Sequence, residues 1–254
     1  DTLVSGEGDD EAEGDDGDDS FVDPGADPLY NDDIFDGGLG NDTGMGGVGD
    51  DELYGDLAGS PKDGNDVLDG GDGEDIVEGS AGSDNVKGGA GNDIVCGGDC
   101  SGFLLGDGRD KVEGGLGDDT LEGGIGADQL VYRNAPSGVE VDASLGFASG
   151  GDGNDAFAGP GFDFEIVGGS MFDDTLVGGN SLFIQGANFR LVGLAGNDRL
   201  VGSSGNDVLK AGKGDDLLIG LAGADVLNGA RGHDTGRGGP GPDTCKSIEV
   251  ARSC

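Results

Sequence analysis

Six consecutive blocks of nine residues run from Gly193 to Lys246, with no residue lost between them. They read GLAGNDRLV, GSSGNDVLK, AGKGDDLLI, GLAGADVLN, GARGHDTGR and GGPGPDTCK. In every block the fourth residue is Gly and the sixth is Asp, and the eighth is Leu in the first four. A period this strict requires a chain that repeats the same turn every nine residues.

The residue types of the block favour a calcium site in each turn. Glycine lets the backbone turn sharply at little steric cost, so carbonyl groups can converge on one point. The Asp two residues after the last Gly adds a carboxylate beside them. Calcium takes about six to eight oxygen ligands, both carboxylates and carbonyls, and one turn supplies about half of these. We therefore expect each ion to be shared between two turns.

The last three residues of the block have the pattern of a short strand whose middle side chain points inward. Two blocks then make one coil of turn, strand, turn and strand. Stacked coils predict an all-β fold, a right-handed parallel β-roll (β-solenoid), with two sheets facing each other and calcium along both edges. The pattern G-G-x-G-x-D-x-U-x, with U a large apolar residue, resembles the nonapeptide of the RTX (repeats-in-toxin) calcium-binding family.

The same frame recurs over most of the chain and defines the predicted metal ligands. Single Asp residues after Gly or Asn are common in turns, but so many in one frame indicate binding. The glycines at the fourth position of the first four regular blocks, Gly196, Gly205, Gly214 and Gly223, are assigned to the same sites. The sixth-position ligands are Asp33, Asp42, Asp51, Asp66, Asp75, Asp84, Asp93, Asp110, Asp119, Asp128, Asp155, Asp174, Asp198, Asp207, Asp216, Asp225, Asp234 and Asp243. They predict roughly eight to twelve Ca²⁺ ions.

The frame divides the chain into four parts. Residues 1–27 are acidic and are interpreted as lacking the nonapeptide register; they form either a solvated tail or an end cap whose strand contains Leu3 or Phe21. Residues 28–131 form a first RTX β-roll, with Phe35 and Leu53 among its inward side chains. Residues 132–192 form an irregular, metal-poor stretch in which aromatic side chains replace acids, either a solenoid held by packing or a docking surface. Residues 193–254 form a regular roll with a C-terminal cap.

The composition links folding to the metal. The net charge is −40, which alone is typical of disorder. Each buried apolar side chain contributes about 1.5–3 kcal/mol, whereas fixing each backbone residue costs about 1–2 kcal/mol. One apolar side chain per block cannot offset nine backbone residues, so we expect folding and calcium binding to be a single event.

The same composition limits the partners and the location. Nucleic acid is excluded because the chain has no basic stripe for phosphates, and no apolar run reaches the ~20 residues of a membrane span. Four cysteines are typical of an oxidising compartment, and weak sites fill only at extracellular calcium levels. The sequence starts at Asp1 rather than Met, as in a protein whose signal peptide has been removed. We expect a secreted, extracellular or cell-surface protein.

Four cysteines allow three pairings. We predict that Cys96 pairs with Cys100 across a shortened turn, and that Cys245 pairs with Cys254 to hold the last strand.

Motifs of catalysis are missing from the sequence. The one histidine, His233, occupies a variable position of the repeat, and neither H-E-x-x-H nor G-x-S-x-G occurs. We therefore expect a protein that is not an enzyme and has no catalytic residues. Its expected role is a structural subunit of a surface, matrix or filament that associates head to tail through its solenoid ends. The alternatives are a calcium-dependent adhesin or ligand-binding module with a surface or glycan ligand, and, more remotely, a glycan-active enzyme using paired carboxylates.

Overall fold

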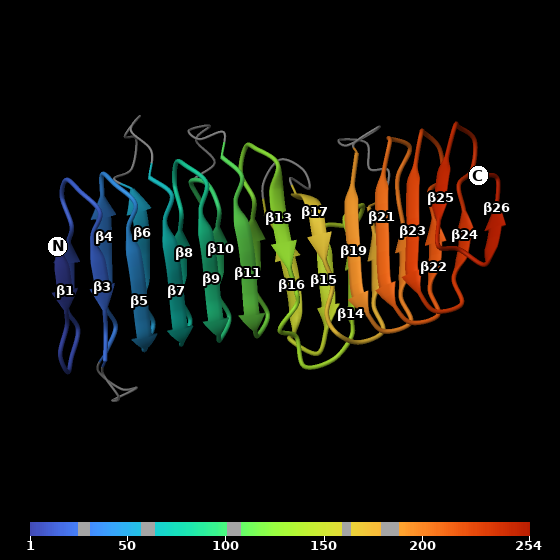
Figure 1. Ribbon diagram of the computed structural model, residues 1–254. Helices are drawn as coiled ribbons and strands as arrows, with labels where there is room; N and C mark the ends of the chain where they lie inside the picture. The colour runs from blue at the N-terminus through green and yellow to red at the C-terminus, as the bar shows by residue number, and fades with distance from the viewer. Residues whose placement is uncertain (25–30, 57–63, 101–107, 159–163, 179–187) are drawn as a thin grey trace. The chain divides into compact units, whose positions relative to one another are not determined.

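The computed structural model describes residues 1–24, 31–56, 64–100, 108–158, 164–178 and 188–254. These residues form strands and turns with no helix among them, so no described segment provides a helix that could cross a membrane. The chain divides into two compact units, Asp1–Leu130 with Asp155–Gly159, and Val131–Asn154 with Pro160–Cys254. Consecutive strands alternate between two sheets (Figure 1), except that the three strands within residues 139–157 all belong to the same sheet. The predicted all-β parallel β-roll is confirmed.

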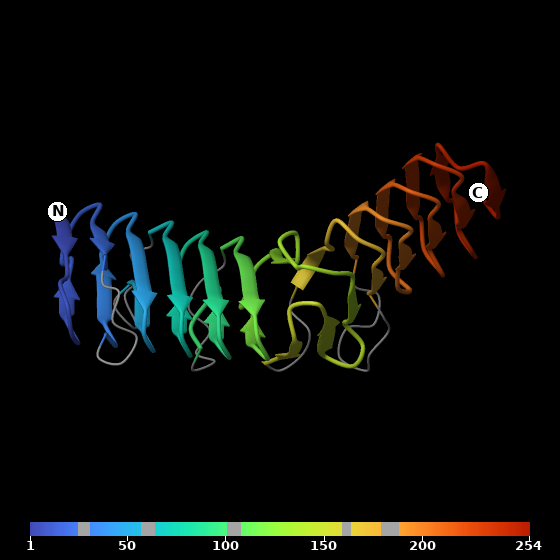
Figure 2. The ribbon, with the colours of Figure 1, turned by 90° about the horizontal axis from the view of Figure 1, so that it is seen from below.

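The first unit contains two ladders of parallel strands. Its first sheet has the order β1 (Thr2–Val4), β3 (Ser20–Val22), β5 (Thr43–Val48), β7 (Val67–Asp72), β9 (Asn85–Ala90), β11 (Lys111–Leu116) and β13 (Asp128–Val131). Its second has the order β2 (Glu11–Glu13), β4 (Ile34–Gly38), β6 (Glu52–Asp56), β8 (Ile76–Glu78), β10 (Ile94–Cys96), β12 (Thr120–Glu122) and β16 (Asn154–Phe157). Figure 2 shows strands of this unit (blue to green) side by side in successive coils.

The second unit repeats this arrangement. One sheet has the order β17 (Phe164–Gly168), β19 (Arg190–Ala195), β21 (Val208–Lys213), β23 (Val226–Arg231) and β25 (Thr244–Lys246). The other has the order β15 (Phe147–Gly150), β14 (Val139–Asp142), β18 (Thr175–Val177), β20 (Arg199–Val201), β22 (Leu217–Ile219), β24 (Thr235–Arg237) and β26 (Val250–Arg252). β14 and β15 form an antiparallel pair, whereas the other pairs are parallel, as in Leu209↔Leu227.

The eighth residue of each block forms the core, because side chains alternate across a strand. In the first unit this row is almost fully buried and consists of Phe21, Phe35, Leu53, Leu68, Val77, Val86, Val95, Val112, Leu121 and Leu130. In the second unit it includes Leu176, Leu191, Leu200, Leu209, Leu218 and Leu227. The predicted inward positions of Phe35 and Leu53 are confirmed.

Two blocks have glycine where the core needs a large side chain, and neighbouring side chains fill the space. A Cβ on Gly44 would lie 2.8 Å from the Phe35 ring, which also stacks on Phe21 with ring centres 5.2 Å apart. A Cβ on Gly236 would lie 2.6 Å from the Ile248 Cδ1 atom. The core is therefore continuous where the repeat pattern fails.

The acidic N-terminal residues are built into the roll, so the interpretation that they lack the nonapeptide register is wrong. β1, β2 and β3 lie within residues 1–22 and pair in register, as in Leu3↔Phe21 and Ala12↔Phe35. The blocks SGEGDDEAE (5–13) and GDDGDDSFV (14–22) keep the fourth-position Gly and the sixth-position Asp. The first block has only Ala12 at its core position, so its strand is joined mainly through backbone groups, whereas the second block adds Phe21 to the core row.

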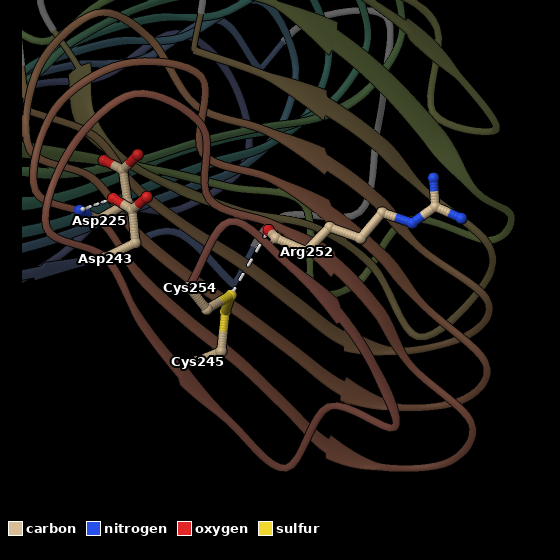
Figure 3. Close-up of a disulfide and its surroundings, with 5 residues drawn as sticks. All are labelled: Asp225, Asp243, Cys245, Arg252 and Cys254. Carbon is tan, nitrogen blue, oxygen red and sulfur yellow. Dashed lines mark hydrogen bonds between the residues drawn. A yellow bond between two sulfur atoms is a disulfide. The ribbon is translucent and has the colours of Figure 1, made fainter.

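Both predicted disulfides are present. Cys96–Cys100 spans the turn after β10, and Cys245–Cys254 joins β25 to the residues after β26 (Figure 3). The Cys254 Sγ atom also lies 3.7 Å from the Arg252 carbonyl oxygen; this is a contact only, since a disulfide sulfur carries no hydrogen. Parts of the predicted loop at 55–60, of the first predicted block at 28–36 and of the aromatic stretch (Phe162, Phe183) lie outside the described residues.

Candidate metal centre in the turns

The sixth-position aspartates stand in hydrogen-bonded ladders along the turns. Seventeen of the eighteen predicted ligands are at most 4% exposed, and Asp243 is half-buried. The backbone N–H of one Asp donates to Oδ1 of the Asp one coil further along: Asp198 N lies 2.8 Å from Asp216 Oδ1, and Asp225 N lies 3.0 Å from Asp243 Oδ1 (Figure 3). One carboxylate oxygen of each Asp thus holds successive coils together.

All predicted ligands belong to four such ladders, two in each unit. Those of the first unit are Asp10–Asp33–Asp51–Asp75–Asp93–Asp119–Asp155 and Asp19–Asp42–Asp66–Asp84–Asp110–Asp128. Those of the second unit are Val139–Asp174–Asp198–Asp216–Asp234–Glu249 and Phe189–Asp207–Asp225–Asp243.

The second carboxylate oxygen, Oδ2, is buried and has no hydrogen-bond partner among the described residues at most of these positions. This holds for Asp19, Asp33, Asp42, Asp51, Asp66, Asp75, Asp84, Asp93, Asp198, Asp216, Asp225, Asp234 and Asp243. A buried carboxylate oxygen without a partner is costly. Because such an oxygen recurs in block after block, we infer that it binds a partner that is not a hydrogen-bond donor of the protein.

The surroundings of this oxygen fit a hard cation. A Cβ on Gly70 would lie against Asp75 Oδ2 and 2.7 Å from the Gly88 carbonyl oxygen. The same arrangement recurs at Gly220, whose Cβ would lie against Asp225 Oδ2 and 2.7 Å from the Gly238 carbonyl oxygen. Carboxylate and carbonyl oxygens therefore converge where the first glycine of the block leaves room. Two acceptors facing each other attract a cation, and this donor set is the one calcium prefers.

No group of three or more His, Cys, Asp and Glu side chains in the described part of the chain is arranged to hold a metal by itself. An ion in the turns would therefore need ligands besides these side chains, such as backbone carbonyls or water. This agrees with the expectation that one turn supplies only part of the ligand set.

Burial makes these carboxylates hard to ionise without a cation. It raises the pKa of Asp84 to about 9, although the hydrogen bond from the Asp66 backbone opposes the shift. Burial, together with neighbouring ladder carboxylates, likewise raises the pKa of Asp51 and of Asp198 to about 7. A divalent cation beside Oδ2 favours the charged form and removes this penalty.

The glycines assigned to the sites allow the coils to stack closely. Gly196, Gly214 and Gly223 have φ of 126°, 136° and 130°, in the left-handed region that favours glycine. A Cβ on Gly214 would also collide with the Gly196 carbonyl oxygen of the preceding coil. Gly205 differs: it is not among the residues of positive φ, and its N–H donates to Ser203 Oγ over 2.9 Å.

Two of the predicted ligands have a protein donor on the second oxygen. Ser203 N lies 2.5 Å from Asp207 Oδ2, and Ser170 N lies 2.7 Å from Asp174 Oδ2. In both blocks a serine stands four residues before the Asp, where the consensus pattern G-G-x-G-x-D-x-U-x has its second glycine. A donor hydrogen at this oxygen weakens its pull on a cation, so these two positions fit calcium less well than the others.

Phenylalanine replaces the ligand at two further positions in the irregular stretch. Phe164 and Phe189 are buried, and the Phe189 backbone N–H still donates to Asp207 Oδ1 over 2.7 Å. A Cβ on Gly178 would lie 2.7 Å from the Phe189 ring. The ring thus packs at the glycine that faces a carboxylate in regular blocks.

Sequence reasoning missed three ladder members. Asp10 and Asp19 belong to the blocks in residues 5–22, and the Gly-x-Asp spacing was the signal available for them. Glu249 accepts the Asp234 N–H at 2.7 Å and ends its ladder. Its signal was weaker, since no glycine precedes it by two residues.

The fifth residue of the block forms a second, exposed ladder. Asp215 N lies 2.9 Å from Asn197 Oδ1, and His233 N lies 2.8 Å from Asp215 Oδ1. His233 takes part through its backbone and its side chain is exposed, as expected for a surface residue.

Comparison with known families was made over the whole chain. The model of the RTX calcium-binding nonapeptide repeat (4 copies) matches residues 1–22, 31–44, 36–57, 69–99, 105–132, 190–218 and 211–245. These ranges cover more than half of the sequence and include the block at 14–22. No curated protein matched the chain.

Proposed function

Since this chain belongs to the family of RTX calcium-binding nonapeptide repeats, we propose that it is a secreted structural subunit that folds on Ca²⁺ and then associates with further copies. The observation that carries the calcium-dependent folding is the row of buried Asp Oδ2 atoms that face backbone carbonyls and find no hydrogen-bond partner in the described part of the chain. Asp75 opposite the Gly88 carbonyl and Asp225 opposite the Gly238 carbonyl are examples. The ladder residues would hold the ions, and bound calcium would supply the positive charge between the coils.

Folding without calcium is unfavourable for two reasons. The ladders bring carboxylates of successive coils together out of water, so the pKa of Asp84 is raised by burial and also by the nearby carboxylates of Asp66 and Asp110. The apolar core is one side chain wide per strand, so it cannot offset this cost together with the ordering of the backbone. Binding energy then becomes folding energy.

The placement of the predicted ligand aspartates, which all stand in the ladders, supports a non-catalytic role. Each predicted ligand has one oxygen on a backbone N–H of the neighbouring coil, as Asp216 has on Asp198. Such carboxylates are placed to bind between coils and not to act on a substrate.

Two observations support an extracellular location. Disulfides Cys96–Cys100 and Cys245–Cys254 persist in oxidising compartments. Weak calcium sites also fill at the roughly millimolar free calcium found outside cells.

Association through the solenoid ends is supported by the outermost strands of the second unit. β25 and β26 are the last strands of their sheets, and all three residues of β26 are exposed. Exposed strand edges template the addition of further strands.

Calcium titration of the full chain tests the folding proposal. In chelator we expect a coil by far-ultraviolet circular dichroism, and in 5 mM calcium a compact β-structure with roughly eight to twelve bound ions by calorimetry. A β-signal of full strength in excess chelator would refute the coupling of folding to calcium.

Light scattering and electron microscopy of the same samples test association. Growth of extended particles in calcium, reversed by chelator, is expected of a structural subunit. A monomer at every calcium concentration would refute self-association and favour the adhesion or ligand-binding module.

A further inference from the structure

The basic residues of the chain are concentrated in its last quarter. Residues 190–254, called the basic segment below, carry eight Lys and Arg against eight Asp and Glu. Residues 1–130, called the acidic unit, carry 37 Asp and Glu against four Lys and Arg. Without metal the basic segment is therefore near neutral, while the acidic unit is strongly negative.

The cations of the basic segment lie on the outside and form no ion pair with any residue that the structure describes. Lys210 is half-buried, and the other seven are exposed: Arg190, Arg199, Lys213, Arg231, Arg237, Lys246 and Arg252. The ion pairs found among the described residues all involve residues 1–113, and none involves a cation of the basic segment. Figure 3 shows the Arg252 side chain extending away from the disulfide.

The register brings some of these cations next to each other. Lys213 pairs with Arg231 between β21 and β23, and Arg237 pairs with Arg252 between β24 and β26. Like charges on adjacent strands destabilise a sheet. A sheet that places two cations directly opposite each other on adjacent strands is suited to bind an anionic partner.

The acids of the basic segment are placed differently from its cations. Seven of the eight belong to the two ladders, namely Asp198, Asp207, Asp216, Asp225, Asp234, Asp243 and Glu249. Asp215, in the exposed ladder, is the exception. Of these seven, five are buried, Asp243 is half-buried and Glu249 is exposed. Calcium in the turns would neutralise the buried ladder acids and leave the exposed cations as they are, so the segment changes from near neutral to positive.

Calcium cannot change the sign of the acidic unit. Twelve of its 37 acids stand in the ladders, and the remaining 25 still outnumber its four cations. Exposed examples lie on β2, where Glu11 and Glu13 flank the inward Ala12. The loaded protein therefore has one positive and one negative part.

We propose that calcium turns the basic segment into a positive surface that docks the acidic unit of a second copy. This proposal rests on the proposed self-association and names its partner surface. Charge complementarity favours a second copy because each molecule brings its own excess of acids. Without calcium, chains of net charge −40 repel each other. Calcium then controls assembly as well as folding, and salt weakens the contact because charges attract over about 8–10 Å at physiological ionic strength.

Light scattering of the full chain in 5 mM calcium tests the proposal with two charge-matched variants. The test variant carries Lys213→Gln, Arg231→Gln, Arg237→Gln and Arg252→Gln. The control variant removes four cations elsewhere, with Lys87→Gln, Arg109→Gln, Lys111→Gln and Arg133→Gln. We expect the concentration for half-association to rise at least tenfold in the test variant and less than threefold in the control. Circular dichroism in calcium confirms that both fold.

A heterotypic rescue identifies the partner surface. The variant Arg237→Glu with Arg252→Glu, and the variant Glu11→Lys with Glu13→Lys, are each expected to associate poorly alone. An equimolar mixture is expected to recover at least part of the wild-type association, because each supplies the charge that the other lacks.

The outcomes separate this proposal from the proposed function. The charge contact is overturned, and self-association is kept, if the wild type associates in calcium while the test variant associates equally well. The same result must hold when NaCl is raised from 50 to 500 mM without loss of association. Equal loss in the test and control variants shows a net-charge effect and also overturns it. Wild type that stays monomeric overturns both. Association restored only by an added acidic polysaccharide assigns the basic segment to that polyanion and overturns the second copy as its partner.

Discussion

Replacing Asp198 by Asn tests directly whether the buried second oxygen is a calcium ligand. Asp198 Oδ1 accepts the Asp174 N–H at 3.0 Å, while Oδ2 has no hydrogen-bond partner among the described residues. A Cβ on Gly193 would lie against Asp198 Oδ2 and 2.8 Å from the Ala211 carbonyl oxygen, so these two oxygens are close together. Asn keeps the shape and the first hydrogen bond. Its amide NH₂ faces the carbonyl and takes the place of the ion.

The size of the effect follows from the loss of one site. A ligand that binds only the folded state stabilises it by RT ln(1 + [L]/Kd). For a Kd of about 10⁻⁴ M, typical of extracellular calcium modules, one site contributes about 1.4 kcal/mol in 1 mM calcium and about 2.7 kcal/mol in 10 mM. The destabilisation by Asp198→Asn should therefore grow by about 1.3 kcal/mol per tenfold calcium.

Asp207→Asn is the matched control. Asp207 Oδ1 also accepts a backbone N–H, from Phe189 at 2.7 Å, but its Oδ2 accepts the Ser203 N–H at 2.5 Å. Asn brings an NH₂ group against that N–H, and an unsatisfied buried donor costs about 1–3 kcal/mol. We expect this cost to be the same at every calcium concentration.

Urea unfolding followed by circular dichroism at 1, 3 and 10 mM calcium measures both slopes. A destabilisation by Asp198→Asn that does not change with calcium would refute the assignment of Oδ2 as a ligand. Equal calcium slopes for Asp198→Asn and Asp207→Asn would refute the argument that the serine N–H displaces the ion.

Three further changes test the core, the turn and the titration of the ladder. Leu209→Ala removes a fully buried side chain and should destabilise the calcium-loaded protein by about 2–5 kcal/mol in urea unfolding; a loss below 1 kcal/mol would contradict the core assignment. Gly214→Ala puts a Cβ at φ 136° against the Gly196 carbonyl oxygen and should cost at least about 1–3 kcal/mol, whereas Lys213→Ala, at the exposed residue beside it, should be nearly neutral. In calcium-free buffer the pKa of Asp84 is raised to about 9 in the folded protein, against 3.8 for an ordinary Asp. The stability gained from its protonation is therefore fully present below about pH 4 and is lost progressively as the pH rises to 9. Circular dichroism should show more β-structure at pH 5 than at pH 8, and the opposite order would contradict this reasoning.

The period of the sequence was sufficient to predict the fold and the ladder positions. A Gly at the fourth position and an Asp at the sixth determine the turn and the acceptor, and both are visible in single blocks such as GSSGNDVLK. The backbone N–H groups that complete the ladders are present whatever the other residues are. This is why the prediction extends to irregular blocks such as the one containing Asp174.

What the sequence did not predict depends on contacts between blocks. Gly44 and Gly236 interrupt the apolar row, and the space is filled by Phe35 from β4 and by Ile248 from the segment between β25 and β26. The strand register that brings these side chains together is not visible in either block alone. A single block with glycine at the core position would therefore by itself leave the core unfilled, although side chains from elsewhere in the fold fill it.

The acidic N-terminal residues were misread for a related reason. SGEGDDEAE has Ala12 at the core position and reads as a charged, flexible segment. Its Asp10 nevertheless donates its backbone N–H to Asp33 Oδ1 at 2.8 Å. The high charge density of this block is typical of disorder, whereas its Gly at the fourth position and Asp at the sixth are typical of the repeat. The structure follows the repeat.

The serines at Asp174 and Asp207 show a further limit. Ser170 and Ser203 are conservative replacements for glycine in a turn, so these blocks cannot be separated from the others by their residue types alone. Only the direction of the serine N–H, toward Oδ2, distinguishes them.

The registers Val208↔Val226 and Leu217↔Thr235 each join residues 18 apart, so the natural unit of length in this protein is the full coil. Deleting a stretch such as 211–228 would bring together strands that already belong to the same sheet and would leave both ladders in phase. Deleting nine residues would exchange the two faces for everything that follows, moving each outward row to the opposite side. Genetic duplication or loss can therefore lengthen or shorten such a molecule in steps of 18 residues while its surfaces keep their character.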